Sequence, residues 1–276
     1  MGIGISYAHV VMNEIIEYNM KTVVFGDIHG RSVWKEIVTE NFDADRFIFL
    51  GDYFTSREGI SEEEQIKNFQ EIVEFARKQN NATIHRDKVV LLRGNHDMEA
   101  CKYPWAECRP SFRSKWVYEN RDFFLENTQW VFVDDLYPII YAHAGITKTW
   151  MERNELTNPE EINELEPSKI FGFTSCRFSD YCGDSVTQPP TWIRPWGLIG
   201  DSFGNYTYVV GHTTMEKITN VKVETLAQYE SDYGDNVDEE TINEIKSAND
   251  IWVCDTLPRE YLTIINGKFE VCKYSE

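Results

Sequence analysis

The chain has 276 residues, of which 42% are apolar and 26% are charged, a composition that is ordinary for a folded globular protein. Its formal net charge of −19 argues against a nucleic acid partner, because such partners are bound through clustered Lys and Arg. A small phosphate ester held at a metal ion stays compatible with this charge, because the metal itself supplies positive charge.

The N-terminal stretch, residues 1–19, precedes the first predicted strand and contains no Lys or Arg, so it makes a poor secretory signal. No apolar run approaches the ~18 residues of a membrane span. The six cysteines are scattered, without the spacing of a zinc site or the density of a secreted disulfide scaffold. We therefore expect a cytoplasmic protein with a dispensable extension over residues 1–19 and one domain over residues 20–276.

The first part of that domain alternates between strands and helices. Apolar runs predict strands at 22–25, 46–50 and 88–92, and helical periodicity follows the first of them at 31–38. A capping box at Ser61 predicts a second helix before the third strand. Right-handed crossovers would make the three strands neighbours in a parallel sheet.

The middle of the chain is less regular. Residues 101–130 are rich in aromatic side chains, which we interpret as core packing under a helix, with a substrate platform as the alternative. Two short strands are predicted at 130–133 and 138–142, joined by a hairpin or a short connection. Residues 147–205 are too many for a plain loop, so we predict a cap-like insertion that contains helices and covers the site.

The last part returns to strands around an acidic insertion. A strand at 206–210 is expected to return to the edge of the sheet. The acidic run at 230–250 predicts a solvated helix or loop insertion, with a partner-binding tail as the alternative. Closing strands are predicted at 250–254 and 261–265, and Asn266-Gly267 predicts a tight hairpin turn after them.

Polar side chains follow five of the apolar runs at the point where each predicted strand ends. They are Asp27, His29, Asp52, Asn95, His96, His143 and His212. The carboxyl ends of parallel strands meet at one edge of a sheet, so these side chains should lie together. Oxygen and nitrogen donors without a thiolate suit Mn, Fe or Zn. Two such ions clamp a displacement at phosphorus and generate hydroxide from bound water near neutral pH.

These strand ends form a series of motifs. The motifs are Gly26-Asp27-Ile28-His29-Gly30, Gly51-Asp52-Tyr53, Leu92-Arg93-Gly94-Asn95-His96-Asp97, His143-Ala144-Gly145 and Gly211-His212-Thr213. The series resembles that of the calcineurin-like metallophosphoesterases, and is most similar to their serine/threonine phosphoprotein phosphatase branch. The resemblance implies an α/β (α+β) fold with two mixed β-sheets packed as a sandwich flanked by helices. It replaces the purely parallel sheet that the alternation of strands and helices suggests alone.

The resemblance also implies which residues hold two divalent metal ions. Asp27 and His29 would hold the first ion and Asp52 would bridge, while Asn95, His143 and His212 would hold the second. We expect Mn²⁺, with Fe and Zn as alternatives, because this donor set accepts all three.

Three further roles follow from the resemblance. His96 matches the general acid that protonates the leaving alkoxide. Arg194 resembles the arginine that binds the substrate phosphate, with a structural salt bridge as its alternative, and Arg57 is a candidate second phosphate ligand. Thr213 stands where many nuclease and cyclic-nucleotide members have a further histidine. That places the chain nearer the protein phosphatases and dinucleoside polyphosphatases.

One position departs from the family pattern. The family usually has an aspartate where this chain has Thr55, and that aspartate would orient the general-acid imidazole. Without a carboxylate partner, His96 should be less readily protonated at neutral pH. We therefore expect a preference for good leaving groups such as aryl phosphates.

The sequence thus predicts a phosphoesterase that depends on two metal ions and attacks with a metal-bridging hydroxide. Within that class we expect a serine/threonine phosphatase-like phosphomonoesterase, with a dinucleoside polyphosphate hydrolase as the alternative. Its partner would be a phosphate ester on a protein, a nucleotide or a small molecule, with no membrane partner. A metal-binding regulatory or scaffold protein without turnover is the alternative from another class. A nucleic-acid enzyme is disfavoured by the net charge and by Thr213.

Overall fold

The computed structural model describes residues 20–82, 87–101, 114–170, 183, 185–233, 238–256 and 259–274. The predicted extension over residues 1–19 lies outside these ranges, as do Trp105 and Phe112 of the aromatic stretch. In the described part, no helix is both long enough and apolar enough to cross a membrane.

The first sheet has five strands in the spatial order β10-β9-β1-β2-β3. In that order their bounds are Lys268–Lys273, Glu260–Ile265, Lys21–Phe25, Arg46–Phe49 and Val89–Leu91. Strands β1, β2 and β3 run parallel, as predicted, with Val24 opposite Ile48 and Ile48 opposite Val90. Strand β9 pairs antiparallel with β1, which makes the sheet mixed.

The second sheet has five strands in the order β4-β5-β6-β8-β7. In that order their bounds are Val131–Val133, Ile139–Ala142, Thr207–Thr214, Ile251–Asp255 and Thr219–Asn220. The predicted pair β4 and β5 is antiparallel, whereas β5, β6 and β8 are parallel. The expectation that the strand near 206–210 lies at the sheet edge is wrong. Strand β6 is central because its apolar run is buried on both faces, which is typical of an interior parallel strand.

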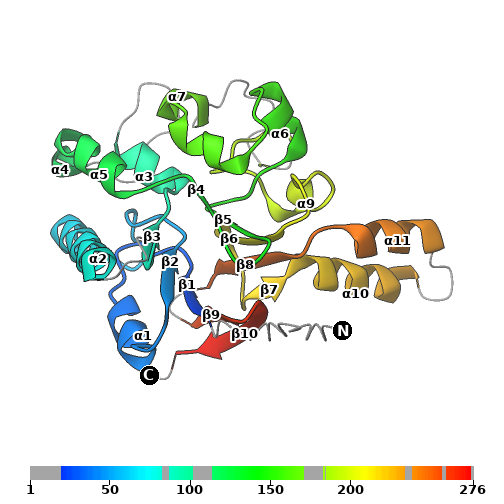
Figure 1. Cartoon of the computed structure of the whole chain (residues 1–276), viewed down its shortest axis with the longest axis horizontal. Coiled ribbons are helices and arrows are strands. Elements are labelled where there is room, and N and C mark those ends of the chain that lie inside the picture. The colour runs from blue at the N-terminus through cyan, green and yellow to red at the C-terminus, as the bar shows by residue number, and fades with distance from the viewer. Residues whose placement is uncertain are drawn as a thin grey trace, which may run out of the picture.

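The two sheets share an apolar core between them. It contains Val24 and Ile48 of the first sheet together with Tyr141 and Val209 of the second, and all four are fully buried. Alternate residues of each strand face this core, and their neighbours face the helices. The predicted sandwich of two mixed sheets with flanking helices is therefore confirmed (Figure 1).

Helices cover the outer face of the first sheet through aromatic side chains. Helices α1 and α2 span Trp34–Glu40 and Glu62–Ala82. The Trp34 ring lies 5.9 Å from that of Phe49, and the Phe75 ring lies 5.6 Å from that of Phe47. Such contacts bury large apolar areas, so they bind the helices to the sheet.

Short helices follow β3 and continue the packing. Helices α3, α4 and α5 span Asn95–Ala100, Lys115–Glu119 and Arg121–Asn127. The ring of Phe124 lies 5.4 Å from that of Phe69 and 6.3 Å from that of Tyr53. The interpretation as core packing is thus confirmed for Phe124 and Trp130, which are each 1% exposed, whereas Tyr118 is exposed.

The segment 147–205 contains helices, as predicted. The described ones are α6, the 3₁₀ helix η1, α7 and α9, which span Lys148–Arg153, Pro159–Glu164, Pro167–Ile170 and Pro195–Ile199. They lie together above the second sheet in Figure 1. Their function as a cap stays a prediction.

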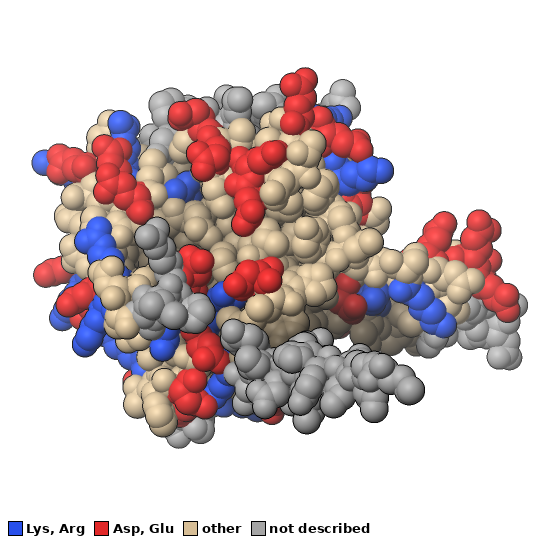
Figure 2. Space-filling view, viewed as in Figure 1, with Lys and Arg blue, Asp and Glu red and all other residues tan. Residues whose placement is uncertain are grey.

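The acidic run is also helical. Helices α10 and α11 span Val221–Tyr233 and Glu239–Ser247, and they project away from the sandwich (Figure 1). The space-filling view shows Asp and Glu side chains at the tip of this projection (Figure 2). The tight turn between β9 and β10 is confirmed as well, because Asn266 and Gly267 have φ angles of 52° and 74°.

Candidate metal centre

The strand ends bring the predicted metal ligands together. The Nε2 atom of His143 lies 3.5 Å from Oδ2 of Asp52 and 3.0 Å from Oδ1 of Asn95. The same Asn95 oxygen lies 2.9 Å from Nδ1 of His212. Asn95 and His212, which are 117 positions apart in sequence, therefore meet at one place.

Asp27 and His29, which are predicted to hold the first metal ion, also lie at this place. Oδ2 of Asp27 is 3.9 Å from Nε2 of His29. Ligand atoms of Asp27, Asp52 and His143 all lie within 4.8 Å of one another, and these three residues are buried. One divalent cation could contact all three, so the arrangement fits the metal chemistry that the donor types predict.

Each of three imidazoles is oriented by a backbone carbonyl. Nδ1 of His143 lies 2.9 Å from the Leu50 oxygen, and Nδ1 of His29 lies 3.0 Å from the Phe54 oxygen. Nε2 of His212 lies 3.2 Å from the Trp192 oxygen. A carbonyl only accepts, so it holds the proton on the nitrogen that faces it. The other nitrogen of each ring then presents a lone pair to the site, which is how metal-binding histidines are oriented.

The backbone takes unusual conformations at these positions. His29, Asp52 and His212 have positive φ angles of 47°, 50° and 61°. Left-handed backbone is uncommon for residues other than glycine and concentrates at functional sites. His29 and Asp52 therefore project from turns that follow their strands, whereas His212 projects from an irregular part of β6, where the register with β8 shifts between Val210 and Thr214.

Two motif glycines make room for the carboxylates. A Cβ atom on Gly94 would lie 2.0 Å from Oδ1 of Asp52, and one on Gly211 would lie 2.1 Å from Oδ1 of Asp27. No side chain fits at either position without displacing a candidate ligand. Glycine at these two positions is thus explained by the close approach of backbone to carboxylate.

The carboxylates influence one another strongly. Burial, together with the charges of Asp255 and Asp52, raises the pKa of Asp27 well above its ordinary value. Burial would also raise the pKa of Asp52, but the nearby imidazoles of His143, His96 and His29 outweigh it and lower that pKa. Crowded buried carboxylates of this kind are stabilised by a bound cation.

Two of the candidate ligand imidazoles, those of His29 and His212, favour the neutral form. Burial lowers the pKa of His29, and burial with the charges of His143 and Arg194 lowers the pKa of His212 well below its ordinary value. A neutral imidazole is the form that binds a metal.

Asp97 is a structural residue of the site to which the sequence assigned no role. Its two carboxylate oxygens accept hydrogen bonds from the backbone N–H groups of Asp52, Tyr53 and Gly94, at 2.9, 2.7 and 2.8 Å. It therefore joins the loop after β2 to the loop after β3. Its position directly after the Asn95-His96 pair is the sequence signal that could have identified it as a residue of the site.

His96 has a carboxylate partner after all. Its Nδ1 lies 3.6 Å from Oε2 of Glu99, which is three residues later on α3 and buried. Burial would lower the pKa of His96, but Asp52 and Glu99 outweigh it and raise that pKa to about 9. The expectation that Thr55 leaves His96 poorly protonated is therefore wrong. Spacing of three on a helix was the signal that could have identified Glu99.

The two predicted phosphate ligands contact neighbouring residues at the end of β6. Nη1 of Arg194 donates to the carbonyl oxygen of His212 and to Oγ1 of Thr213, both at 3.1 Å. Nη1 of Arg57 lies 3.5 Å from Oγ1 of Thr214. Both arginines border the site, and their binding of phosphate stays a prediction.

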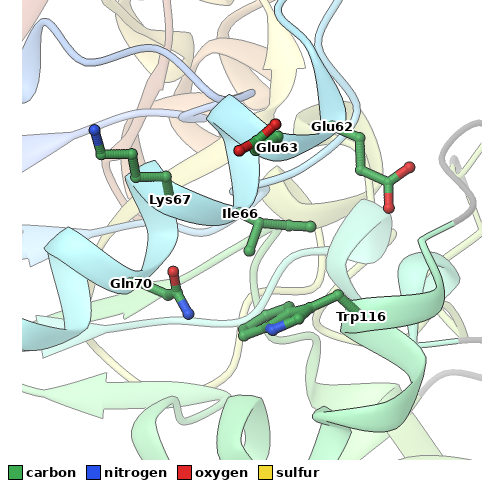
Figure 3. Close-up of a pocket in the computed structure, with 6 residues that line it drawn as sticks. All are labelled: Glu62, Glu63, Ile66, Lys67, Gln70 and Trp116. Carbon is green, nitrogen blue, oxygen red and sulfur yellow. The ribbon is translucent and has the colours of Figure 1, made fainter.

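A further hollow lies elsewhere, between α2 and α4 (Figure 3). It has a volume of about 510 Å³, and Ile66 and Trp116 form its apolar part. Its charged side chains include Glu62, Glu63 and Lys67. None of the predicted site residues lines it, so it adds nothing to the chemistry of the strand ends.

Known proteins resemble this chain in sequence pattern and in fold. The family model described as calcineurin-like phosphoesterase matches residues 20–216. No curated protein sequence matches the chain. A cold-active protein tyrosine phosphatase structure is 15% identical, covers 92% of this chain and 78% of its own, and has a TM-score of 0.50. At that identity the likeness concerns the fold alone.

Two other solved structures align over most of the chain. A metallophosphoesterase from Sphaerobacter thermophilus is 15% identical, with coverage of 93% and 88% and a TM-score of 0.42. A protein serine/threonine phosphatase from Saccharomyces cerevisiae is 11% identical, with coverage of 94% and 81% and a TM-score of 0.48.

Proposed function

The chain belongs to the calcineurin-like phosphoesterase family, and from that premise we propose that it hydrolyses phosphate monoesters in the manner of serine/threonine phosphatases. One observation carries the proposal. Three buried imidazoles each give one ring nitrogen to a backbone carbonyl and turn the other toward a shared cluster of carboxylate and amide oxygens. That arrangement has no use in a purely structural core, where buried polar groups are satisfied by one another.

Two divalent ions are assigned to this cluster. Asp27 and His29 would hold one ion, Asp52 would bridge, and Asn95, His143 and His212 would hold the other. We propose Mn²⁺, and Fe or Zn would suit the same donors. When bound, such ions lower the pKa of water and neutralise charge on phosphoryl oxygens.

The chain's own residues would do the rest. His96 would give a proton to the leaving-group oxygen, with Glu99 beside its Nδ1 to hold the ring. Arg194 would bind the phosphoryl oxygens through its fork of donors. Asp97 would keep Asp52 and His96 in place through the two loops that it joins.

The alternative of a scaffold without turnover loses its main support. It was based on Thr55, where the family has the carboxylate that orients the general acid. Glu99 supplies a carboxylate beside His96 from another position. An imidazole with a carboxylate beside it suits proton transfer, which supports the proposal of an enzyme.

A second candidate function is the hydrolysis of dinucleoside polyphosphates. It is favoured by a pocket beside His29 that is lined by three arginines. Arginine binds phosphoryl groups through several donors at once, so such a pocket suits a substrate with more than one of them.

The test is phosphate release by metal-stripped protein that has been reconstituted with Mn²⁺. A phosphoserine peptide, a diadenosine polyphosphate and 4-nitrophenyl phosphate are compared, with Asp52→Asn as the blank. Turnover that requires both metal and Asp52 is expected. Turnover of the peptide would identify a protein phosphatase, and preference for the dinucleotide would identify the second candidate function. Bound Mn²⁺ with no turnover of any of the three would refute both.

A further inference from the structure

A pocket of about 230 Å³ borders the candidate metal centre on the side of His29. Its lining includes Arg31, Arg57 and Arg259, and we call it the arginine pocket. The three residues come from separate segments, which follow β1, β2 and β8. The chain has only 27 Lys and Arg against 46 Asp and Glu, so three arginines in one hollow beside a catalytic centre require an explanation.

The arginines differ in how they are paired. Nε of Arg31 lies 2.7 Å from Oε1 of Glu58, and its Nη1 donates to the backbone oxygen of Asp27 at 3.3 Å. Neither Arg57 nor Arg259 forms an ion pair with any carboxylate in the described part of the chain. In a protein with such an excess of acid, two cations without an acidic partner in one pocket are available to an anion from outside.

The acidic residues of the pocket are already engaged. Glu58 pairs with Arg31, as described above. Asp255 is 5% exposed and accepts a hydrogen bond from the hydroxyl of Thr214 at 2.7 Å. It also lies near enough to Asp27 to raise the pKa of that carboxyl. The charge of Asp255 thus lies toward the metal centre, whereas Arg57 and Arg259 are exposed at the surface of the pocket.

We propose that the arginine pocket binds a second phosphoryl group of the substrate, next to the one that is hydrolysed at the metal centre. The inference deepens the second candidate function, the hydrolysis of substrates with more than one phosphoryl group, and rests on the proposed hydrolysis at the metal centre. Guanidinium groups match phosphoryl oxygens in geometry and bind them through paired hydrogen bonds. His29 belongs both to the pocket and to the metal centre, so a substrate could span them with adjacent phosphoryl groups. The substrate class is therefore small molecules that carry two or more phosphoryl groups.

The test compares inorganic diphosphate with orthophosphate as inhibitors of 4-nitrophenyl phosphate hydrolysis by the full Mn²⁺-loaded chain, with free Mn²⁺ kept in excess. Diphosphate is expected to inhibit more strongly than orthophosphate. In Arg259→Ala the ratio of the two inhibition constants should fall about tenfold, the effect of one charged hydrogen-bonding group. Arg259→Lys should give an intermediate ratio, because lysine keeps the charge and loses the fork.

Arg153→Ala is the matched control. Arg153 is exposed at the end of α6 and does not line the pocket, so its loss should leave the ratio unchanged. Equal inhibition by the two anions, or the same ratio in Arg259→Ala as in the unmodified chain, would overturn the proposal. The proposal would also be overturned if Arg259→Ala weakened only the binding of acidic phosphopeptides, because the pocket would then bind carboxylates. If the pocket proposal fails in any of these ways, the chain still hydrolyses 4-nitrophenyl phosphate. If the proposed function fails, the chain does not hydrolyse 4-nitrophenyl phosphate.

Discussion

Acidic side chains gather in two regions of the molecule, and they are buried in one region and exposed to solvent in the other. At the candidate metal centre, Asp27, Asp52 and Asp97 are at most 1% exposed. On the helical pair α10–α11, Glu240 and Glu244 are exposed to solvent. Burial raises the pKa of Asp27 and of Asp97, with a contribution from the charge of Asp52 in each case. In the helical pair, water screens the same kind of charge.

The comparison teaches where this chain keeps unfavourable electrostatics. A buried carboxylate without a counter-ion costs free energy, and the fold retains several in one place. Glycines that admit the carboxylates and backbone bonds to Asp97 hold them there. A bound cation would turn that cost into binding energy. The exposed carboxylates of the helical pair carry no such free-energy cost and need no cation, so their charge affects only solubility and surface potential.

The largest effect is expected from Asp27→Asn. Turnover should fall about a thousandfold, because the substitution removes a proposed metal ligand and with it several kcal/mol of transition-state stabilisation. The metal-free fold should become more stable at neutral and alkaline pH. The pKa of Asp27 is raised in the folded state. The ionised wild-type carboxylate therefore lowers the free energy of unfolding progressively as the pH rises above the ordinary pKa of an aspartate. Thermal unfolding against pH, with metal removed, measures this.

Glu240→Gln, on the helical pair, is the control for Asp27→Asn. It removes one acidic charge without touching the strand ends, and it should change neither turnover nor the pH dependence of unfolding. A metal-free Asp27→Asn protein that is less stable than the wild type across this pH range would contradict the contrast between the regions.

Gly94→Ala tests whether space for the carboxylate decides the site. A Cβ atom there would lie 2.0 Å from Oδ1 and 2.6 Å from the backbone nitrogen of Asp52. We expect a loss of about 1–3 kcal/mol in unfolding free energy, the usual cost of overpacking, and weaker Mn²⁺ binding. Chemical denaturation and calorimetric metal titration would measure the two.

Gly200→Ala is its matched control. Nothing lies within 4 Å of a Cβ atom at Gly200, which has right-handed helical backbone, so stability and metal affinity should be retained. Equal Mn²⁺ affinity in the two variants would show that the site tolerates displacement of Asp52.

Glu99→Gln should act on proton donation more than on metal binding. Turnover of a phosphoserine peptide is expected to fall about ten- to a hundredfold, within the range that general acids contribute. Turnover of 4-nitrophenyl phosphate should change much less, because its leaving group needs no proton. The pKa of His96 is raised to about 9 in part by Glu99. In the metal-free variant the imidazole should therefore lose its proton at lower pH, which NMR would detect.

Glu119→Gln, on exposed α4, is the control for this substitution. If Glu99→Gln lowered turnover of both substrates equally, Glu99 would support the fold of α3 rather than orient His96. An unchanged titration of His96 would lead to the same conclusion.

The smallest effect is expected from the double substitution Glu240→Gln and Glu244→Gln. Both side chains are exposed, and exposed charges contribute little to stability. Turnover, melting temperature and Mn²⁺ affinity should all be unchanged. A clear fall in turnover would show that the helical pair contacts the substrate or the site.

The sequence by itself determined the strands, the turn at Asn266-Gly267 and the set of strand-end side chains. These are local properties, because an apolar run with a polar end depends only on neighbouring residues. The same locality explains why Asp52 and Asn95 lie together, because they follow the parallel neighbours β2 and β3, whose ends meet at one edge. His143 follows β5 of the second sheet, so only the packing of the two sheets brings it to them.

Only the tertiary structure decided what depends on distant segments. Packing of the two sheets placed β6 at the centre of its sheet rather than at the edge. The pairing of β2 with β3 set Asp97 against Tyr53, 44 residues away. The arrangement of the two sheets gathered Arg31 and Arg259 in one pocket. Contacts between distant segments do not follow from any local pattern, because burial between sheets selects which segments meet. The partner of His96 is the exception, since Glu99 lies only three residues later on the same helix.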